Sequence, residues 1–156
     1  MTVGRVRLVV RGEIRVPGDK SVSHRALMFG SLADGQSRVR GVLQSADIES
    51  TAGALRALGW PVPALSSDMV VEGSGLAHCP LPVARLDLGN SGTSTRLLMG
   101  IVAGYPITST FTGDASLSKR PMKRVAKPLM EMGARIEFEG GRDGLPLTMH
   151  GGNLKG

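Results

Sequence analysis

The sequence is poor in three kinds of feature, and each shortage excludes a class of protein or site. Its single cysteine, Cys79, excludes an internal disulfide and any metal site built from several cysteines. His78 precedes it, but one adjacent pair in the segment "HCPLP" has neither the number nor the spacing of metal ligands. We therefore expect a loop there.

Aromatic residues make up only 3% of the chain, so its core must consist of Leu, Val, Ala and Met. The net charge of +6 indicates a negatively charged partner. Nucleic acid is disfavoured, because proteins that bind single strands usually add stacking aromatics and because the basic residues here are dispersed. A small phosphorylated or carboxylated ligand fits better, although charge alone also fits a basic surface that binds nothing specific.

Long hydrophobic runs are missing as well. The first residues, "MTVGRVRLVVRGEIRV", alternate apolar and polar side chains and carry charges throughout. This pattern predicts a strand at about 3–16 rather than a signal peptide or a membrane span. With 156 residues, 41% of them apolar, the chain is long enough for a domain with a real core, and we expect a cytoplasmic protein.

An internal repeat organises the remaining sequence, because residues 23–62 align with residues 94–136. The alignment pairs Arg25 with Arg96, Leu27 with Leu98, Met28 with Met99, Leu55 with Leu129 and Gly59 with Gly133. Each copy predicts two helices, a strand between them and a closing hairpin. The predicted ranges are helices 24–33 and 94–103, strands 37–43 and 108–113, helices 47–58 and 120–132, and hairpins 61–64 with 68–72 and 134–139 with 145–149.

These elements predict an α/β (α+β) fold made of βαβαββ units, the first at about 18–80 and the second at about 81–156. One unit is too thin to bury its own helices, and repeats of this kind need about three copies. We therefore expect the chain to hold two of the three units of a domain.

Two equivalent turns are rich in glycine and hydroxyl side chains, "GDKSVSHR" and "LGNSGTSTR", and each opens the first helix of its copy. Free backbone N–H groups at a helix start favour an anion, and Lys20, Arg25 and Arg96 add positive charge. The alternative is ordinary capping by the residues that favour helix starts, namely Ser21, Ser23, Asn90 and Thr93. The repetition of the arginine at the same offset favours a shared anion site.

A third motif, "TGDASLSKRPMKR" at 112–124, places Arg120 directly before Pro121. This position suits the first turn of a helix, where a positive charge is unfavourable unless an anion compensates it. Lys119, Lys123 and Arg124 are explained by a solvated helix face. We expect His24 to face its own helix turn without a catalytic role.

The segments "PGDKSVSHR", "LGNSGTSTR" and "GDASLSKRPM" resemble the signature segments of the EPSP synthase family, over nearly the whole chain from about Gly12. The last segment, with "LMEMGARIE", looks most like the bacterial class II, which includes glyphosate-tolerant members. The sister family that transfers enolpyruvate to UDP-N-acetylglucosamine has Lys-Asn-Ala in its first motif, and "DKSVSHR" speaks against it.

The resemblance implies a two-domain enzyme of the shikimate pathway, an inside-out α/β barrel with three βαβαββ units in each domain. Its active site lies in the cleft between the domains. There the enolpyruvyl group of phosphoenolpyruvate moves to the 5-hydroxyl of shikimate 3-phosphate, with release of phosphate and without a metal or organic cofactor. Glyphosate is the expected inhibitor.

The family's site residues carry over onto matching positions of this chain. Lys20 would be the catalytic residue and contact both substrates. Ser21 and Arg25 would hold shikimate 3-phosphate, and Lys20, Asn90, Gly92, Thr93, Arg96 and Arg120 would bind phosphoenolpyruvate.

Family members are about three times as long as this chain, so the resemblance implies an N-terminal portion. Residues 1–17 would be a strand and hinge that pack with a second domain, and 18–156 would be a partial substrate-binding domain. Such a portion would be inactive without its complementary C-terminal part. The alternative is a stand-alone anion-binding module that does no chemistry.

Overall fold

The computed structural model describes residues 9–78, 83–152 and 154–156. The elements are α1 (Lys20–Leu32), β1 (Asp34–Arg40), α2 (Ala46–Ala57), β2 (Asp68–Ser74), β3 (Val83–Asp87), α3 (Gly92–Ala103), β4 (Thr108–Thr112), the 3-10 turn η1 (Leu117–Lys119), α4 (Lys123–Glu131), β5 (Arg135–Phe138), the 3-10 turn η2 (Glu139–Gly141) and β6 (Leu147–His150). The βαβαββ order is confirmed in the second unit, from β3 to β6. The predicted hairpin that closes this unit is also confirmed, because β5 pairs antiparallel with β6.

The first unit departs from the prediction at its hairpin. Residues 61–64 form no strand, and β2 pairs antiparallel with β1 instead. Pro61 and Pro63 have no backbone N–H to donate to a ladder. The carbonyl groups of Val62 and Pro63 accept hydrogen bonds at 2.7 Å from the side chain of Arg56, so this segment is held against α2 rather than in a sheet.

The second helix of the second unit begins later than predicted. Arg120 is extended, with φ −78° and ψ 137°, because the residue before a proline is disfavoured in the helical region. The prediction that Arg120 lies in the first helical turn is therefore wrong. The side chain of Asp143 accepts hydrogen bonds from the backbone N–H groups of Met122 and Lys123, at 2.7 and 2.8 Å, where α4 starts.

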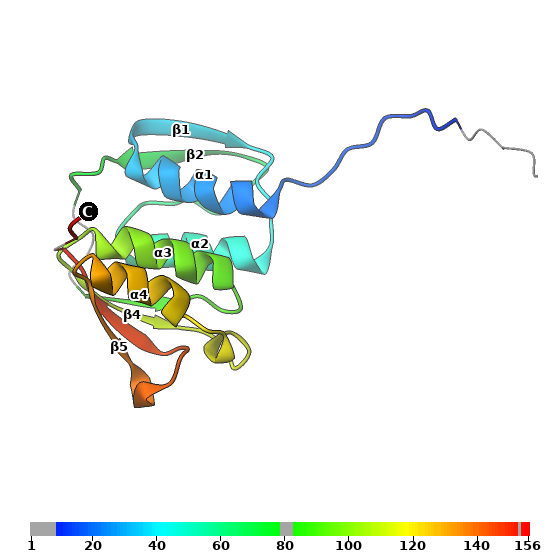
Figure 1. Ribbon diagram of the computed structural model, residues 1–156. Helices are drawn as coiled ribbons and strands as arrows, with labels where there is room; N and C mark the ends of the chain where they lie inside the picture. Colours follow the sequence, from blue (N-terminus) through cyan, green and yellow to red (C-terminus); the bar gives the residue numbers. More distant parts are fainter. Residues whose placement is uncertain (1–8, 79–82, 153) are drawn as a thin grey trace, which may run out of the picture.

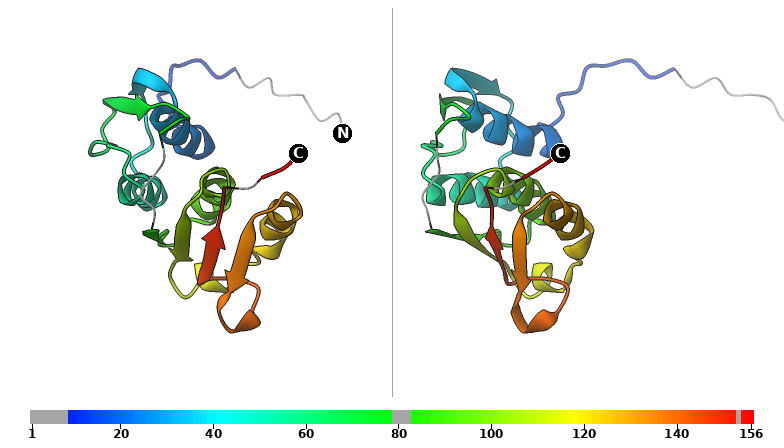
Figure 2. Two further views of the ribbon diagram at one scale, coloured as in Figure 1. Left: turned by 90° about the vertical axis from the view of Figure 1, so that its left-hand side faces the viewer. Right: turned by 60° about the vertical axis from the view of Figure 1, so that its left-hand side comes forward.

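The helices lie between two sheets (Figure 2). One is the β1–β2 pair, and the other has the order β3-β4-β6-β5, with β3 parallel to β4 and the remaining pairs antiparallel. The four helices run side by side, and each begins at the end of the molecule from which the N-terminal segment departs (Figure 1). The fold therefore gathers the helix starts, with their free N–H groups, at one end.

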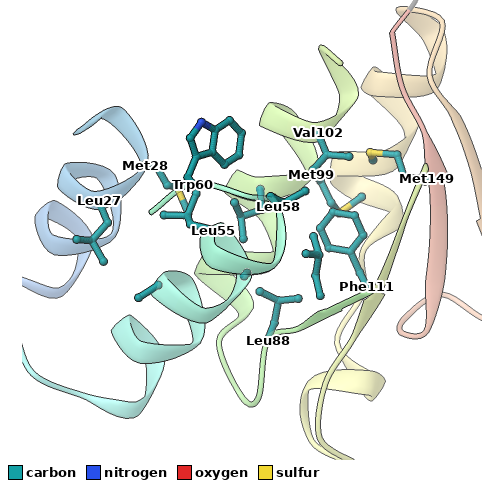
Figure 3. Close-up of a cluster of buried hydrophobic side chains, with 14 of the residues drawn as sticks. Leu27, Met28, Leu55, Leu58, Trp60, Leu88, Met99, Val102, Phe111 and Met149 are labelled. Carbon is teal, nitrogen blue, oxygen red and sulfur yellow. The ribbon is translucent and has the colours of Figure 1, made fainter. Parts of the chain in front are cut away.

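One apolar core joins both units (Figure 3). The leucine–methionine pair of each repeat, Leu27–Met28 and Leu98–Met99, is at most 2% exposed, as the alignment requires. The glycines that follow α2 and α4, Gly59 and Gly133, have φ of 97° and 114°. Both helices therefore end at a left-handed glycine, which a side chain would strain.

The N-terminal segment forms no strand over its described part. Residues 9–19 lie outside every helix and strand. Four apolar residues of this segment are between 63% and 85% exposed, namely Val9, Val10, Ile14 and Val16. An isolated segment with no neighbouring strand leaves its backbone without ladder partners. The assignment of residues 1–17 to a second domain stays a prediction. Cys79 lies outside the described residues.

None of the helices in the described ranges is long and apolar enough to cross a membrane.

Candidate anion-binding site

The first turns of α1 and α2 are joined by an ion pair between Lys20 and Asp47. Lys20 is the first residue of α1, and its side chain is about half exposed at 52%. The carboxylate of Asp47 is more covered, at 22%. The ammonium group of Lys20 is therefore held at the surface, at the end of the molecule where the helices begin.

Neither helix start is capped by the residues that the capping alternative requires. The N-cap of α1 is Asp19, whose carboxylate accepts a hydrogen bond from the N–H of Val22 at 2.7 Å. The N-cap of α3 is Ser91, which accepts from the N–H of Ser94 at 3.3 Å. The hydroxyl groups of Ser21 and Thr93 are exposed and have no hydrogen bond to the described chain, so they are available to a ligand.

The start of α3 is flanked by two guanidinium groups. A Cβ atom added at Gly92 would lie 3.2 Å from an Nη atom of both Arg96 and Arg120. The side chain of Asn90 links the same cluster to the loop that follows β4, because it accepts from Arg120 and donates to Asp114 at 2.6 Å. Glycine at this position therefore leaves a backbone surface that both arginines face.

Asp114 fixes the loop that carries Arg120. Its second carboxylate oxygen accepts from the N–H of Leu117 at 2.7 Å, and its own N–H donates to the carbonyl of Gly89 at 2.8 Å. The pKa of Asp114 lies below its ordinary value, first because of the Asn90 hydrogen bond and then because of the Leu117 N–H. The carboxylate is thus ionised and tied to both loops.

No carboxylate is in direct ion-pair contact with the arginines of this cluster, although the charge of Asp114 acts on Arg120 from the other side of Asn90. Among the described residues, none of Arg25, Arg96 and Arg120 forms an ion pair, and the Nε atom of Arg96 is buried without a hydrogen-bond partner. The pKa of Arg96 is lowered, first by burial and then by the charges of Arg124 and Arg120. Like charges held together with an unsatisfied donor are unfavourable unless an anion joins them.

The predicted residues fall into two groups. Asn90, Gly92, Arg96 and Arg120 lie together around the start of α3, with Thr93 in its first turn. Lys20, Ser21 and Arg25 lie in the first two turns of α1. Arg25 is exposed, and its side chain forms no hydrogen bond or ion pair with the described residues. The prediction that His24 faces its own helix turn is wrong, because its Nδ1 atom lies 2.7 Å from Thr51 Oγ1 on α2.

Sequence reasoning missed the residues that connect these groups. Asp47 orients Lys20, and Asp114 orients Arg120 through Asn90. In the interior, Thr51 bonds to His24 and to Ser94. Asp114 stands inside the quoted motif "GDASLSKRPM", which was the only signal for it. Thr51 and Ser94 occupy the apolar faces of their helices, where a hydroxyl is unexpected.

Within the ranges that the structure describes, no group of three or more His, Cys, Asp or Glu side chains is placed to hold a metal ion.

The comparisons with known proteins agree with this architecture. The family described as EPSP synthase (3-phosphoshikimate 1-carboxyvinyltransferase) matches residues 6–156. This chain belongs to the EPSP synthase family. Among its curated relatives, the 3-phosphoshikimate 1-carboxyvinyltransferase of Novosphingobium aromaticivorans is 55% identical over 91% of this chain and 32% of the relative. That of Bacillus licheniformis is 47% identical over 94% of this chain and 34% of the relative.

Solved structures of the family have the same fold. The EPSP synthase from Acinetobacter baumannii matches with a TM-score of 0.84 at 44% identity, over 93% of this chain and 33% of that chain. This chain therefore spans about a third of the length of the EPSP synthases that it matches.

Proposed function

We propose that the chain supplies the N-terminal part of an EPSP synthase active site, which is complete only with the remaining two thirds of the enzyme. Two anionic substrates would meet where the helices begin. Phosphoenolpyruvate would lie against Gly92, between Arg96 and Arg120. Shikimate 3-phosphate would lie against the start of α1, with Ser21 and Arg25. The observation that carries the proposal is the pair of arginines that face Gly92 without a direct ion pair in the described chain, one of them with a buried, unsatisfied Nε atom.

The chemistry of the transfer needs such charges. The 5-hydroxyl oxygen of shikimate 3-phosphate loses its proton and bonds to C2 of phosphoenolpyruvate while C3 gains a proton, so the C2–C3 double bond becomes single. The bond from C2 to the phosphate oxygen then breaks as C3 loses a proton, which restores the double bond and releases phosphate. The intermediate is tetrahedral and anionic, and fixed cations stabilise it without reorganisation at the moment of reaction. Lys20, held by Asp47 beside the α1 start, would donate to both substrates as the new bond forms.

The arginines would act mainly through orientation. A guanidinium group grips a phosphate or carboxylate with two parallel hydrogen bonds, so two of them fix the angle of the ligand. Asn90 and Asp114 hold Arg120 in place before the ligand arrives, which lowers the cost of binding. Glyphosate, a small anion, would compete for the same position. The cytoplasmic location stays a prediction.

Binding is tested by NMR titration of the 156-residue chain with shikimate 3-phosphate, with phosphoenolpyruvate and with a short oligonucleotide. We expect the first two ligands to shift the amides of Ser21, Arg25 and Gly92. Arg120→Gln should weaken binding of phosphoenolpyruvate about tenfold or more, since a charged hydrogen bond is lost. Arg135→Gln is the matched control, because Arg135 lies at the start of β5, beyond the other end of α4.

Catalysis is tested by mixing the chain with the remaining two thirds of the Bacillus licheniformis relative and measuring phosphate release. Activity in the mixture, lost with Lys20→Met, supports the proposal. Binding without activity in a folded complex would instead favour the stand-alone anion-binding module. Shifts with the oligonucleotide alone would overturn both.

A further inference from the structure

Buried polar side chains gather below the helix starts. Among the described residues, eight polar side chains are buried, and six of them lie in the first two turns of a helix or at its N-cap: Ser23, His24, Thr51, Ser91, Ser94 and Thr95. A buried polar group costs free energy unless it is hydrogen-bonded, so a cluster of them in an apolar core needs a reason. The proposed substrate contacts do not use these side chains.

Four of these six side chains form one continuous chain of hydrogen bonds. His24 Nδ1 lies 2.7 Å from Thr51 Oγ1, which lies 2.6 Å from Ser94 Oγ, and Ser94 Oγ lies 2.5 Å from the hydroxyl of Ser91. The chain passes from α1 to α2 and on to α3 and its cap. All four residues are fully buried, with 0% exposed surface, so water does not replace these bonds.

Three members of this chain, His24, Thr51 and Ser94, lie close in sequence to residues of the anion site. His24 is one helical turn after Lys20, and Thr51 is one turn after Asp47. Ser94 lies between Gly92 and Arg96 in the first turn of α3. A shift of one helix against another would therefore break a buried hydrogen bond and move the corresponding charge.

We propose that His24, Thr51 and Ser94 are positioning residues, whose buried hydrogen bonds hold the starts of α1, α2 and α3 at the separation that two anionic substrates require. This inference rests on the proposed function for its consequence in binding. The positioning itself is a property of the chain and is measured without a ligand.

The neutral form of His24 suits this role. Its Nε2 atom is buried and has no hydrogen-bond partner in the described chain, so a second N–H and a full charge would both be unsatisfied. Burial lowers the pKa of His24, and the nearby Lys20 lowers it further, while Asp47 opposes them.

Thr51 gives the sharpest test, because valine has nearly its shape and lacks only the hydroxyl. Thr51→Val should weaken binding of shikimate 3-phosphate by about tenfold at most in protein that is still folded, and Thr51→Ser should restore it. The matched control is Thr95→Val. Thr95 is equally buried, but its hydroxyl donates to the carbonyl of Ser91, the N-cap of the same helix, at 2.8 Å.

Amide hydrogen exchange measures the positioning directly. Thr51→Val should speed exchange in the first turns of both α1 and α3, whereas Thr95→Val should affect α3 alone. The proposal is overturned if the effects of Thr51→Val are confined to α2, or if a folded Thr51→Val protein binds as the unchanged chain does. If the unchanged chain binds no shikimate 3-phosphate, the proposed function falls, and the exchange pattern still decides whether these residues join the helix starts.

Discussion

Gly92 lies where a side chain would meet two guanidinium groups and no backbone. A methyl group there would be 3.2 Å from each, closer than ordinary contact, but both neighbours are the ends of flexible side chains. Gly92→Ala should therefore leave the free energy of unfolding nearly unchanged or slightly higher, because alanine favours helices. The arginines must move aside, so we expect affinity for phosphoenolpyruvate and glyphosate to fall by roughly tenfold.

Gly100→Ala is the control for this substitution. Gly100 lies in the same helix and has nothing within 4 Å of its added Cβ atom. Titration of both variants with each ligand gives the comparison. Equal affinities in the two variants would contradict the placement of phosphoenolpyruvate at Gly92.

His24 couples stability to pH in the window just below neutrality. Its pKa in the folded chain is lowered from 6.5, mainly by burial, so the unfolded chain binds a proton first as the pH falls. The contribution of His24 is fully present above pH 6.5 and decreases as the pH falls from 6.5 towards the folded pKa. Asp47 and Lys20 face His24 and act in opposite directions on this pKa.

Urea unfolding measures this effect, followed by the fluorescence of Trp60, the single tryptophan. We expect the free energy of unfolding to drop between about pH 7 and pH 5, and His24→Gln to have a smaller slope there. Asp68, Asp114 and Asp143 affect stability in a separate pH range. Their pKa values are lowered from 3.8, so their contributions to the free energy of unfolding are lost only in stronger acid. Identical slopes would show that His24 is not the group that titrates.

At the scale of the element, α4 is stabilised from outside its own sequence. Its N-cap residue, Met122, makes no side-chain cap, and its first turn contains Lys123 and Arg124 without an acidic residue. The Asp143 carboxylate accepts from two of the free N–H groups and places a negative charge at the helix start. The helix thus depends on a residue 20 positions away from Lys123.

Asp143→Ala should lower the free energy of unfolding by about 1 kcal/mol, the usual effect of losing a cap. Asp143→Asn keeps an oxygen acceptor and should lose less than half of that. Urea unfolding of the two variants checks the order. If alanine were tolerated as well as asparagine, the helix start would be satisfied by water.

The contrast between α3 and α4 shows how far sequence alone leads. Apolar spacing predicts both helices and the closing hairpin, because those patterns depend on neighbours in the chain. Proline explains, after the fact, why the 61–64 strand and the first turn at Arg120 were wrong predictions. The caps Asp143 and Asp19 were missed because several nearby Ser, Asn and Asp residues are equally suitable cap candidates in the sequence. Only the geometry of the folded chain decides among them.

The candidate site could likewise be predicted only in part. The cations of the motifs were predictable, since the repeat places Arg25 and Arg96 at equivalent positions. The contacts of Lys20 and His24 could not be predicted, because Lys20–Asp47 and His24–Thr51 join residues 27 positions apart. Contacts at that separation depend on how the helices pack, which no local pattern specifies.

At the scale of the whole molecule, apolar surface remains uncovered on α1 and along the N-terminal segment. Phe29 and Val22 on α1 are 65% and 56% exposed, and Ile14 is 85% exposed. Exposed apolar side chains of this size are usual where another part of a protein packs. They agree with a chain that spans a third of its relatives' length.

The direction in which the N-terminal segment leaves the molecule is set at Gly18. A Cβ atom there would lie only 1.8 Å from the carbonyl oxygen of Gly41 and 3.0 Å from the N–H nitrogen of Leu43, and both are backbone atoms that cannot turn aside. Leu43 is itself held, because its N–H donates to the hydroxyl of Ser23 on α1 at 3.0 Å. The backbone at Gly18 is therefore packed closely against the backbone at Gly41 and Leu43, directly before the anion site.

Gly18→Ala should lower the free energy of unfolding by about 1–3 kcal/mol, since the backbone must shift to admit one methyl group. Gly12→Ala is the control, because Gly12 has no atom within 4 Å and its variant should change stability by less than about 0.5 kcal/mol. The same shift moves Asp19 and Lys20 at the α1 start, so Gly18→Ala should also reduce phosphate release in the mixture with the remaining two thirds of the relative. Full activity in a destabilised Gly18→Ala protein would show that the crossing sets stability but not the position of Lys20.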